Sequence, residues 1–266
     1  MKNNVLALTS ALLIGSALAP ATFAADMAAP AAPAVAPTTN YWSGMYIGGV
    51  LGGGWETTDT NSGVGTLFIP GPAVPPQMFQ TTSGSGFIGG IEGGSNYQFG
   101  KLVVGWEGDI LWGNIKGSSA TAFTGFAGAP TSALLRVDTP WTATVASRVG
   151  IAHERWLAYG KAGVAYEHTD FTASASSAAP LLFGATGSNN RTGWMVGGGL
   201  EWAIWGNWTV KGEYDYLDFG NRSVALNGST TFIAPPSVPT VVTTLNSQRI
   251  SEFKFGINWK FMPNLW

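Results

Sequence analysis

The stretch Glu252-Phe253-Lys254-Phe255-Gly256-Ile257-Asn258-Trp259-Lys260-Phe261 alternates between two kinds of side chain. Its odd-numbered positions carry aromatic or aliphatic groups, and its even-numbered positions carry charged, small or polar groups. Because successive residues of a β-strand point to opposite sides, this period of two predicts a strand with one apolar and one polar face. Its length fits the roughly 9 to 11 residues with which a tilted strand crosses a bilayer.

Seven further segments show the same alternation. It is clearest in the segments whose charged residues lie on one face and whose apolar residues lie on the other. Four of the seven are weaker, because they carry single charges or charges near one end. The predicted strands cover residues 45–57, 84–98, 101–116, 139–151, 156–170, 191–204, 208–219 and 249–261.

The composition decides which face of these strands is outside. Charged residues make up 11% of the 266-residue chain, against roughly 25% in soluble domains. A lipocalin-like soluble barrel of this size needs many more ionised residues on its surface, whereas a lipid-facing exterior needs almost none. No mature segment is a long uninterrupted apolar run, which disfavours transmembrane helices. We therefore predict an all-β fold, an eight-stranded antiparallel up-and-down transmembrane β-barrel.

The same composition excludes several classes of function. The chain has no cysteine, and its formal net charge is −2. Disulfides and thiolate metal sites are therefore impossible, and the basic surface expected of a nucleic-acid-binding protein is missing. We predict no catalytic, cofactor-binding or metal site, and the sequence does not indicate an oligomeric state.

The N-terminal residues have the pattern of a processing signal. Lys2 precedes an apolar run, and small residues follow at Thr22 and Ala24. We predict a signal peptide over residues 1–24, an Ala/Pro-rich periplasmic leader over 25–40 and the outer-membrane barrel over 41–266. A buried N-terminal helix is the alternative, but Pro20 disfavours it.

The charged residues within the predicted strands share the face opposite the apolar one. In a membrane barrel that face lines the lumen, where acidic and basic side chains can pair. The predicted lumen charge network consists of Glu92, Glu107, Asp109, Arg148, Lys161, Glu167, Glu201, Lys211, Glu213, Asp215, Glu252 and Lys254.

Long and short connections alternate between the predicted strands, as an up-and-down barrel requires. Short ones lie near 99–100, 152–155 and 205–207, and we expect these to face the periplasm. Long ones span 58–83, 117–138, 171–190 and 220–248; their Gly, Ser, Thr, Ala and Pro content predicts mobile external loops.

Aromatic residues gather near the predicted strand ends, where amphipathic rings form girdles at the lipid headgroups. The predicted girdle residues are Trp42, Tyr46, Tyr97, Phe99, Trp141, Trp156, Trp202, Trp205, Trp208 and Phe261. Alternatively, any one of these rings is present as a good strand former.

The segment 41–49, YWSGMYIGG, followed by Gly52-Gly53-Gly54-Trp55, resembles the first strand of a known family, the small Omp25/Omp31-like outer-membrane β-barrel proteins (porin family) of α-proteobacteria. The segments 160–166, 193–201 and 211–220 resemble the same family in the same order. The resemblance implies a Gram-negative outer-membrane location and a structural or surface-antigen role. It also implies outer-membrane lipid and lipopolysaccharide as partners.

The segment 254–261 also looks like the C-terminal signal that the outer-membrane assembly machinery recognises. The residues that carry this likeness are Lys254, Gly256, Trp259 and Phe261. The chain departs from the usual pattern because it continues to Trp266.

An eight-stranded barrel has an interior just wide enough for side chains to fill it. We therefore predict a non-enzymatic barrel with an envelope-structural and surface-display role and at most narrow permeation of small solutes. A conducting porin is the first alternative. Small residues on the lumen face favour either a narrow water path or close packing; they are Gly48, Gly52, Gly86, Gly90 and Gly94.

Two further alternatives remain. The resemblance implies one of them, a surface binding protein or adhesin of haem or host surfaces; for haem, His153 and His168 are the only histidines available to ligate iron. The other is a lipid A-modifying enzyme with His168 and Asp170 beside a loop hydroxyl. We expect His168 to be an interfacial residue beside a loop acid instead.

Overall fold

The computed structural model describes residues 41–63, 81–124, 130–177, 181–232 and 238–261. The predicted signal peptide and leader lie outside these residues. No helix long and apolar enough to cross a membrane occurs among them. The strands are β1 (Gly44–Gly63), β2 (Thr82–Phe99), β3 (Leu102–Thr124), β4 (Pro130–His153), β5 (Trp156–Ser177), β6 (Leu181–Trp205), β7 (Trp208–Phe232) and β8 (Val238–Phe261).

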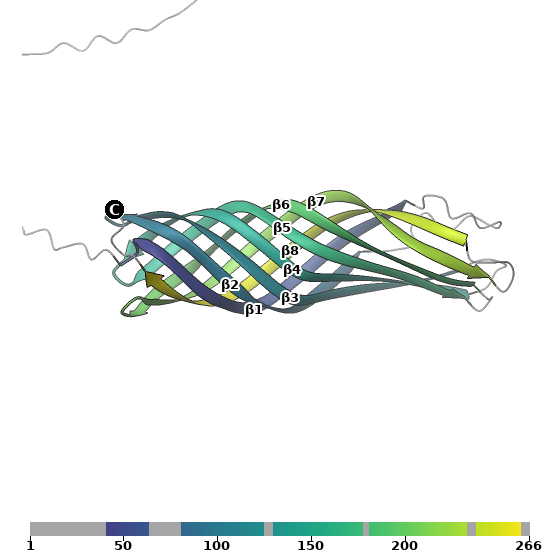
Figure 1. The fold of residues 1–266 in the computed structure, drawn as a ribbon, viewed down its shortest axis with the longest axis horizontal. Helices are drawn as coiled ribbons and strands as arrows, with labels where there is room; N and C mark the ends of the chain where they lie inside the picture. The colour runs from purple at the N-terminus through teal and green to yellow at the C-terminus, as the bar shows by residue number, and fades with distance from the viewer. Residues whose placement is uncertain (1–40, 64–80, 125–129, 178–180, 233–237, 262–266) are drawn as a thin grey trace, which may run out of the picture. The chain divides into compact units, whose positions relative to one another are not determined.

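The eight strands form a closed antiparallel barrel in chain order, which confirms the predicted fold class. Each strand pairs with its neighbours in sequence, and β1 closes the ring on β8 through the register Met45 to Phe261. Figure 1 shows the strands winding steeply around a common axis. Two-residue turns follow β2, β4 and β6, and each contains a residue with positive φ: Gly100, Glu154 and Gly206. We call the end with these turns the lower end.

All eight predicted strands are present, but each is longer than predicted at its upper end. The predicted long loops 117–138, 171–190 and 220–248 were therefore largely wrong, whereas most of the predicted loop 58–83 lies outside the described residues. Residues 117–124 and 130–138 pair with each other, and 131–138 pair with 170–177. Residues 221–230 likewise pair with 238–247. The strand β6 has 25 residues, and at about 3.3 Å per residue and a tilt near 40° it rises roughly 60 Å. The apolar band of such barrels is only about 25 Å tall.

The lower half of the wall has an apolar outer surface bounded by two rings of aromatic side chains. Between the rings, the exposed residues include Leu51, Ile91, Val145 and Leu200. The lower aromatic belt consists of Tyr97, Phe99, Trp156, Trp202, Trp205, Trp208 and Trp259. The upper aromatic belt consists of Trp55, Trp112, Trp141, Tyr166, Trp194 and Tyr216. The belts mark the two membrane interfaces.

Above the upper belt the pattern reverses. Inward positions become apolar and form a core cluster of Ala133, Leu135, Val137, Phe171, Ala173, Ala175, Ala185, Val224 and Leu226. Outward positions become polar, as at Ser132, Thr172 and Asn227, which are exposed. This part, which we call the upper section, is therefore organised like a water-soluble β-structure, with its apolar side chains inside.

Two of the ten predicted girdle residues lie inside the barrel instead. Tyr46 has the same parity as the inward-facing Gly48, so its ring points into the lumen and its hydroxyl meets Glu107. Trp42 precedes β1 and is 1% exposed, because the segment before the strand folds into the lower mouth. The other eight rings lie on the outer wall or at its lower rim.

Glycines on the inner face allow neighbouring strands to approach closely. A Cβ atom built at Gly48, Gly52, Gly86, Gly90 or Gly94 overlaps a carbonyl oxygen of the adjacent strand. This favours the close-packing interpretation of these residues over a water path. Gly163 on β5 is in the same situation, because its Cβ meets the Val145 carbonyl and comes within 2.5 Å of the Ala146 Cα.

We predict that Gly163→Val prevents closure of the barrel. The control is Gly160→Val on the same strand, where the position is exposed and an added Cβ meets no atom nearer than the Gly197 oxygen at 3.8 Å. Folded barrels migrate differently in unboiled and boiled gel samples. The Gly160 variant should keep this heat-dependent shift, and the Gly163 variant should lose it; a shift of equal yield in both contradicts the packing argument.

Candidate functional site

The interior between the two aromatic belts holds a dense cluster of ionisable side chains. Eleven of the twelve predicted lumen charges belong to it, and each is at most 5% exposed. We call it the lumen network; it consists of Glu92, Glu107, Asp109, Arg148, Lys161, Glu201, Lys211, Glu213, Asp215, Glu252 and Lys254. They come from β2 to β8, because on each strand the inward parity at this height carries a charge.

Arg148 of β4 connects the lower part of the lumen network. Its guanidinium donates to Glu107 at 3.0 Å and to Glu201 at 2.7 Å. It also donates to the Tyr46 hydroxyl at 2.9 Å and lies 3.9 Å from the centre of the Tyr159 ring. A buried guanidinium needs several acceptors, and the planar fork of arginine meets carboxylates with favourable geometry.

Three lysines supply the remaining positive charges of the lumen network. Lys161 lies 3.0 Å from Glu107 and 2.7 Å from Glu213. Lys211 lies 2.7 Å from Glu92 and 3.0 Å from Glu107, and Lys254 lies 2.8 Å from Asp109 and 2.6 Å from Asp215. Each ammonium group therefore touches carboxylates from at least two strands.

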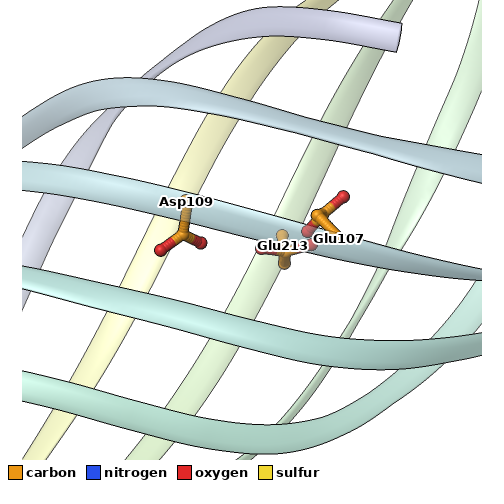
Figure 2. A group of neighbouring side chains, drawn as sticks. All are labelled: Glu107, Asp109 and Glu213. Atoms are coloured by element: carbon orange, nitrogen blue, oxygen red, sulfur yellow. The ribbon is translucent and has the colours of Figure 1, made fainter. Parts of the chain in front are cut away.

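Three carboxylates of the network lie close enough together to resemble a metal site. One oxygen each from Glu107, Asp109 and Glu213 falls within 4.8 Å of the others. Figure 2 shows these side chains pointing into the barrel from β3 and β7. The ammonium groups of Lys161 and Lys254 lie among them, at 2.7 Å and 3.1 Å from Glu213. The lysines thus supply the positive charge that a metal ion supplies in a carboxylate metal site.

The lower mouth of the barrel is closed by Trp42. Its ring packs among Val103, Ala152, Leu157, Tyr159 and Ala203. Its backbone N–H donates to Gln98, and the Lys260 ammonium lies 5.5 Å from the centre of its ring. This plug lies directly below the lumen network.

Above the lumen network most inward positions are apolar, with Thr142 of β4 as a polar exception. Toward the upper end of the barrel, the next inward residues beyond the network on β3, β7 and β8 are Leu111, Leu217 and Ile250. They pack with Met195 and Phe219. We call this the middle apolar layer. It separates the lumen network from a second polar group higher in the barrel.

The second group contains Glu167, the twelfth predicted charge, which thus lies apart from the other eleven. Its carboxylate is 3.7 Å from the buried Arg191. Glu56 lies in the same region and accepts hydrogen bonds from Thr58, Thr139 and Gln248. Sequence reasoning did not include Glu56 and Arg191 in the network, although Glu56 shares the inward parity of Gly48 and Gly52.

The predicted assembly residues divide between the two faces of β8. Lys254 belongs to the lumen network, and Gly256 lies against the side chains of Lys211 and Val50. Trp259 and Phe261 are on the outer side, with their rings stacked 5.7 Å apart. The four residues therefore share no single surface in the folded barrel.

The two histidines lie in different parts of the barrel. His153 ends β4 at the lower rim. His168 lies on the outer wall next to the upper belt and stacks on Trp141. Its Nδ1 is 2.6 Å from the Asn190 side-chain oxygen and its Nε2 is 3.5 Å from Asp170. Neither of these partners is a nucleophilic hydroxyl.

Comparison with known proteins agrees with this architecture. The family model described as the outer membrane protein beta-barrel domain matches residues 17–261. The 31 kDa outer-membrane immunogenic protein of Brucella melitensis biotype 1 is 32% identical over 237 residues, or 84% of this chain and 90% of that protein. The 25 kDa outer-membrane immunogenic protein of the same organism is 27% identical over 262 residues, covering 96% and 99%. Among solved structures, Neisserial surface protein A is similar at 16% identity, with a TM-score of 0.37 over 82% of this chain and 98% of that chain.

We predict that Arg148→Ala lowers the free energy of unfolding by about 3 to 5 kcal/mol, because it leaves buried carboxylates without their partner. The control is Arg249→Ala, which removes an equally charged side chain that is 46% exposed and also lies near two carboxylates, Asp59 and Asp218. There the loss should be at most about 1 kcal/mol. Urea titration of the refolded barrel in detergent, followed by tryptophan fluorescence, measures both. Equal losses contradict the assignment of Arg148 as a structural centre.

Proposed function

Because this chain belongs to the family of outer membrane protein β-barrel domains, we propose that it serves as a closed, non-enzymatic envelope barrel that carries a rigid surface for display. Its relatives place it in the outer membrane as a protein of the Omp25/Omp31 type. The proposal concerns what the barrel does there.

The filled interior carries this proposal. Between the two aromatic belts, the network residues Arg148, Lys211 and Lys254 are at most 3% exposed. The Trp42 plug lies below them and the middle apolar layer lies above. Continuous water through the barrel needs a gap in all of these layers at once. The interior therefore supports a structural barrel in preference to a conducting porin, with at most narrow permeation of small solutes.

The upper section supports the display role. Its strands continue the barrel well beyond the upper belt, and its apolar core holds them together. Its outer surface is polar and suited to water. The names of two relatives describe them as immunogenic, which fits a family whose members present ordered surface outside the cell.

Two observations argue against an enzyme. The only described outward-facing histidine near the upper belt is His168, and its ring nitrogens face Asn190 and Asp170. Acyl transfer needs a nucleophile beside such a ring. The carboxylates of the lumen network are enclosed and paired with lysine or arginine, so substrates do not reach them.

We further propose that the assembly machinery recognises the C-terminal strand before the barrel closes. After closure, Lys254 and Gly256 are inside, and only Trp259 and Phe261 are accessible from the lipid side. Recognition of all four residues therefore requires β8 to be unpaired or only partly paired. Outer-membrane lipid is the second partner, since it covers the apolar wall between the belts.

We predict that the reconstituted barrel is electrically silent in planar bilayers, because side chains fill its lumen at three levels. A sixteen-stranded porin reconstituted in the same way is the control, since barrels of that size leave an aqueous channel. The heat-dependent gel shift first verifies that the protein is folded. Reproducible open steps from the verified barrel overturn the proposal and make it a porin.

We predict that Phe261→Ala slows insertion by the purified assembly complex in proteoliposomes, while unassisted refolding in detergent keeps its rate. The control is Phe253→Ala, another outward aromatic of β8 that precedes the signal segment. The quantity to compare is the ratio of assisted to unassisted folding rates. If both variants lower this ratio equally, Phe261 has no particular role in recognition.

A further inference from the structure

Acidic, basic and histidine side chains on the described outer wall are confined to two bands. One is the lower rim, with Lys101, His153, Glu154 and Arg155. The other lies just above the upper belt and contains Asp59, Lys116, Arg136, Asp138, His168, Asp170, Asp218, Arg222 and Arg249. Headgroups of the outer leaflet lie at the height of this second band, because the belt marks the edge of the apolar region.

The band contains a groove on the outer face of β3, β4 and β5. Its volume is about 450 Å³, and it is lined by Lys116, Gly117, Ser118, Arg136, Val137, Asp138, Asp170 and Thr172. Two of these residues are cations, and two carry hydroxyl groups. The groove therefore combines the two kinds of donor with which proteins hold phosphate.

The height of the groove follows from the strand register. Trp112 and Trp141 of the upper belt are paired, and Lys116 and Asp138 are the next register pair above them that faces outward. Both strand pairs that meet here, β3–β4 and β4–β5, have a register irregularity between the belt and the groove. Such bulges redirect side chains locally. Lys116 lies four residues above Trp112 and Arg136 five residues above Trp141, so both leave the wall close to the membrane interface.

The charges around the groove leave the cations available. Arg136 is exposed, and its cross-strand neighbours are the uncharged Ser118 and Thr172. Lys116 is 61% exposed and only loosely paired with Asp138, at 3.5 Å. Asp170 is the second acid and lies 3.5 Å from the His168 ring. A planar guanidinium beside an ammonium group suits a phosphate that approaches from the lipid side.

We propose that this groove binds the phosphorylated headgroup of an outer-leaflet glycolipid, with Arg136 and Lys116 contacting a phosphate and Ser118 and Thr172 donating hydrogen bonds. The acyl chains of that lipid then lie on the apolar wall below, beside Trp112 and Trp141. The inference goes beyond the proposed function and uses only the outer-membrane location. It therefore does not depend on whether the lumen conducts.

The test uses the full mature barrel in detergent and native mass spectrometry with purified lipid A, before and after enzymatic removal of its phosphates. The wild type should retain phosphorylated lipid A more strongly than the dephosphorylated form. The variant Lys116→Gln/Arg136→Gln should bind the phosphorylated lipid at least about tenfold more weakly, since it loses two charge-assisted contacts. The two positions changed in this variant, and the two changed in the control variant described next, are all on the outer wall. The heat-dependent gel shift verifies that both variants fold.

The matched control is Arg222→Gln/Arg249→Gln, which removes the same charge from the same band on β7 and β8. This variant should keep the wild-type affinity. Equal weakening in both variants overturns the proposed groove and leaves a general effect of net charge. Equal binding of the two lipid forms also overturns it, and so does displacement of the lipid by millimolar inorganic phosphate, which indicates a site for free anions.

Discussion

The structure depends on one constraint: charges removed from water must satisfy one another. The lumen network contains four cations and seven carboxyl groups within a space closed at both ends. Removing ions from water costs several kcal/mol each, and only close partners and hydrogen bonds offset this cost. All eight strands contribute, since Tyr46 of β1 donates to Glu107 and Glu92 of β2 meets Lys211. The partners are far apart in sequence, as with Lys254 and Asp109, so the network is complete only when the ring is closed.

The surroundings of the wall explain why its two faces exchange character along the axis. Between the belts the outside is lipid, so apolar residues such as Leu51 and Val145 face outward and charges face inward. Above the upper belt the outside is water, and Leu135 and Phe171 turn inward while Ser132 and Thr172 face outward. The backbone ladder continues through both parts without a change of partner for β4, β5 and β6. One sheet therefore meets two solvents by exchanging which parity is apolar.

This exchange also explains what the sequence could and could not predict. The lower half contrasts large apolar with charged residues, so its strands and the inward position of the twelve charges follow from a period of two. The upper section alternates small residues, as in Thr172-Ala173-Ser174-Ala175, and this weak contrast resembles a loop. Arg191 was missed because it stood at the first residue of a predicted strand. Tyr46 was misplaced because its proximity to a strand end was given more weight than its parity, and Trp42 precedes the strand, where parity gives no information.

The layered interior separates the tasks of the molecule. The belts hold the barrel at a fixed height, and the lumen network and the Trp42 plug close it at that height. The middle apolar layer, with Met195, Leu217 and Phe219, lies between this closed part and the upper section. Packing is short-ranged, and the side chains of this layer are apolar; at the same height Thr142, which donates to Glu252, is a hydrogen-bonded contact with the lumen network below. Sequence change in the upper section is therefore compatible with an unchanged membrane anchor, which is the property that a surface-displaying barrel requires.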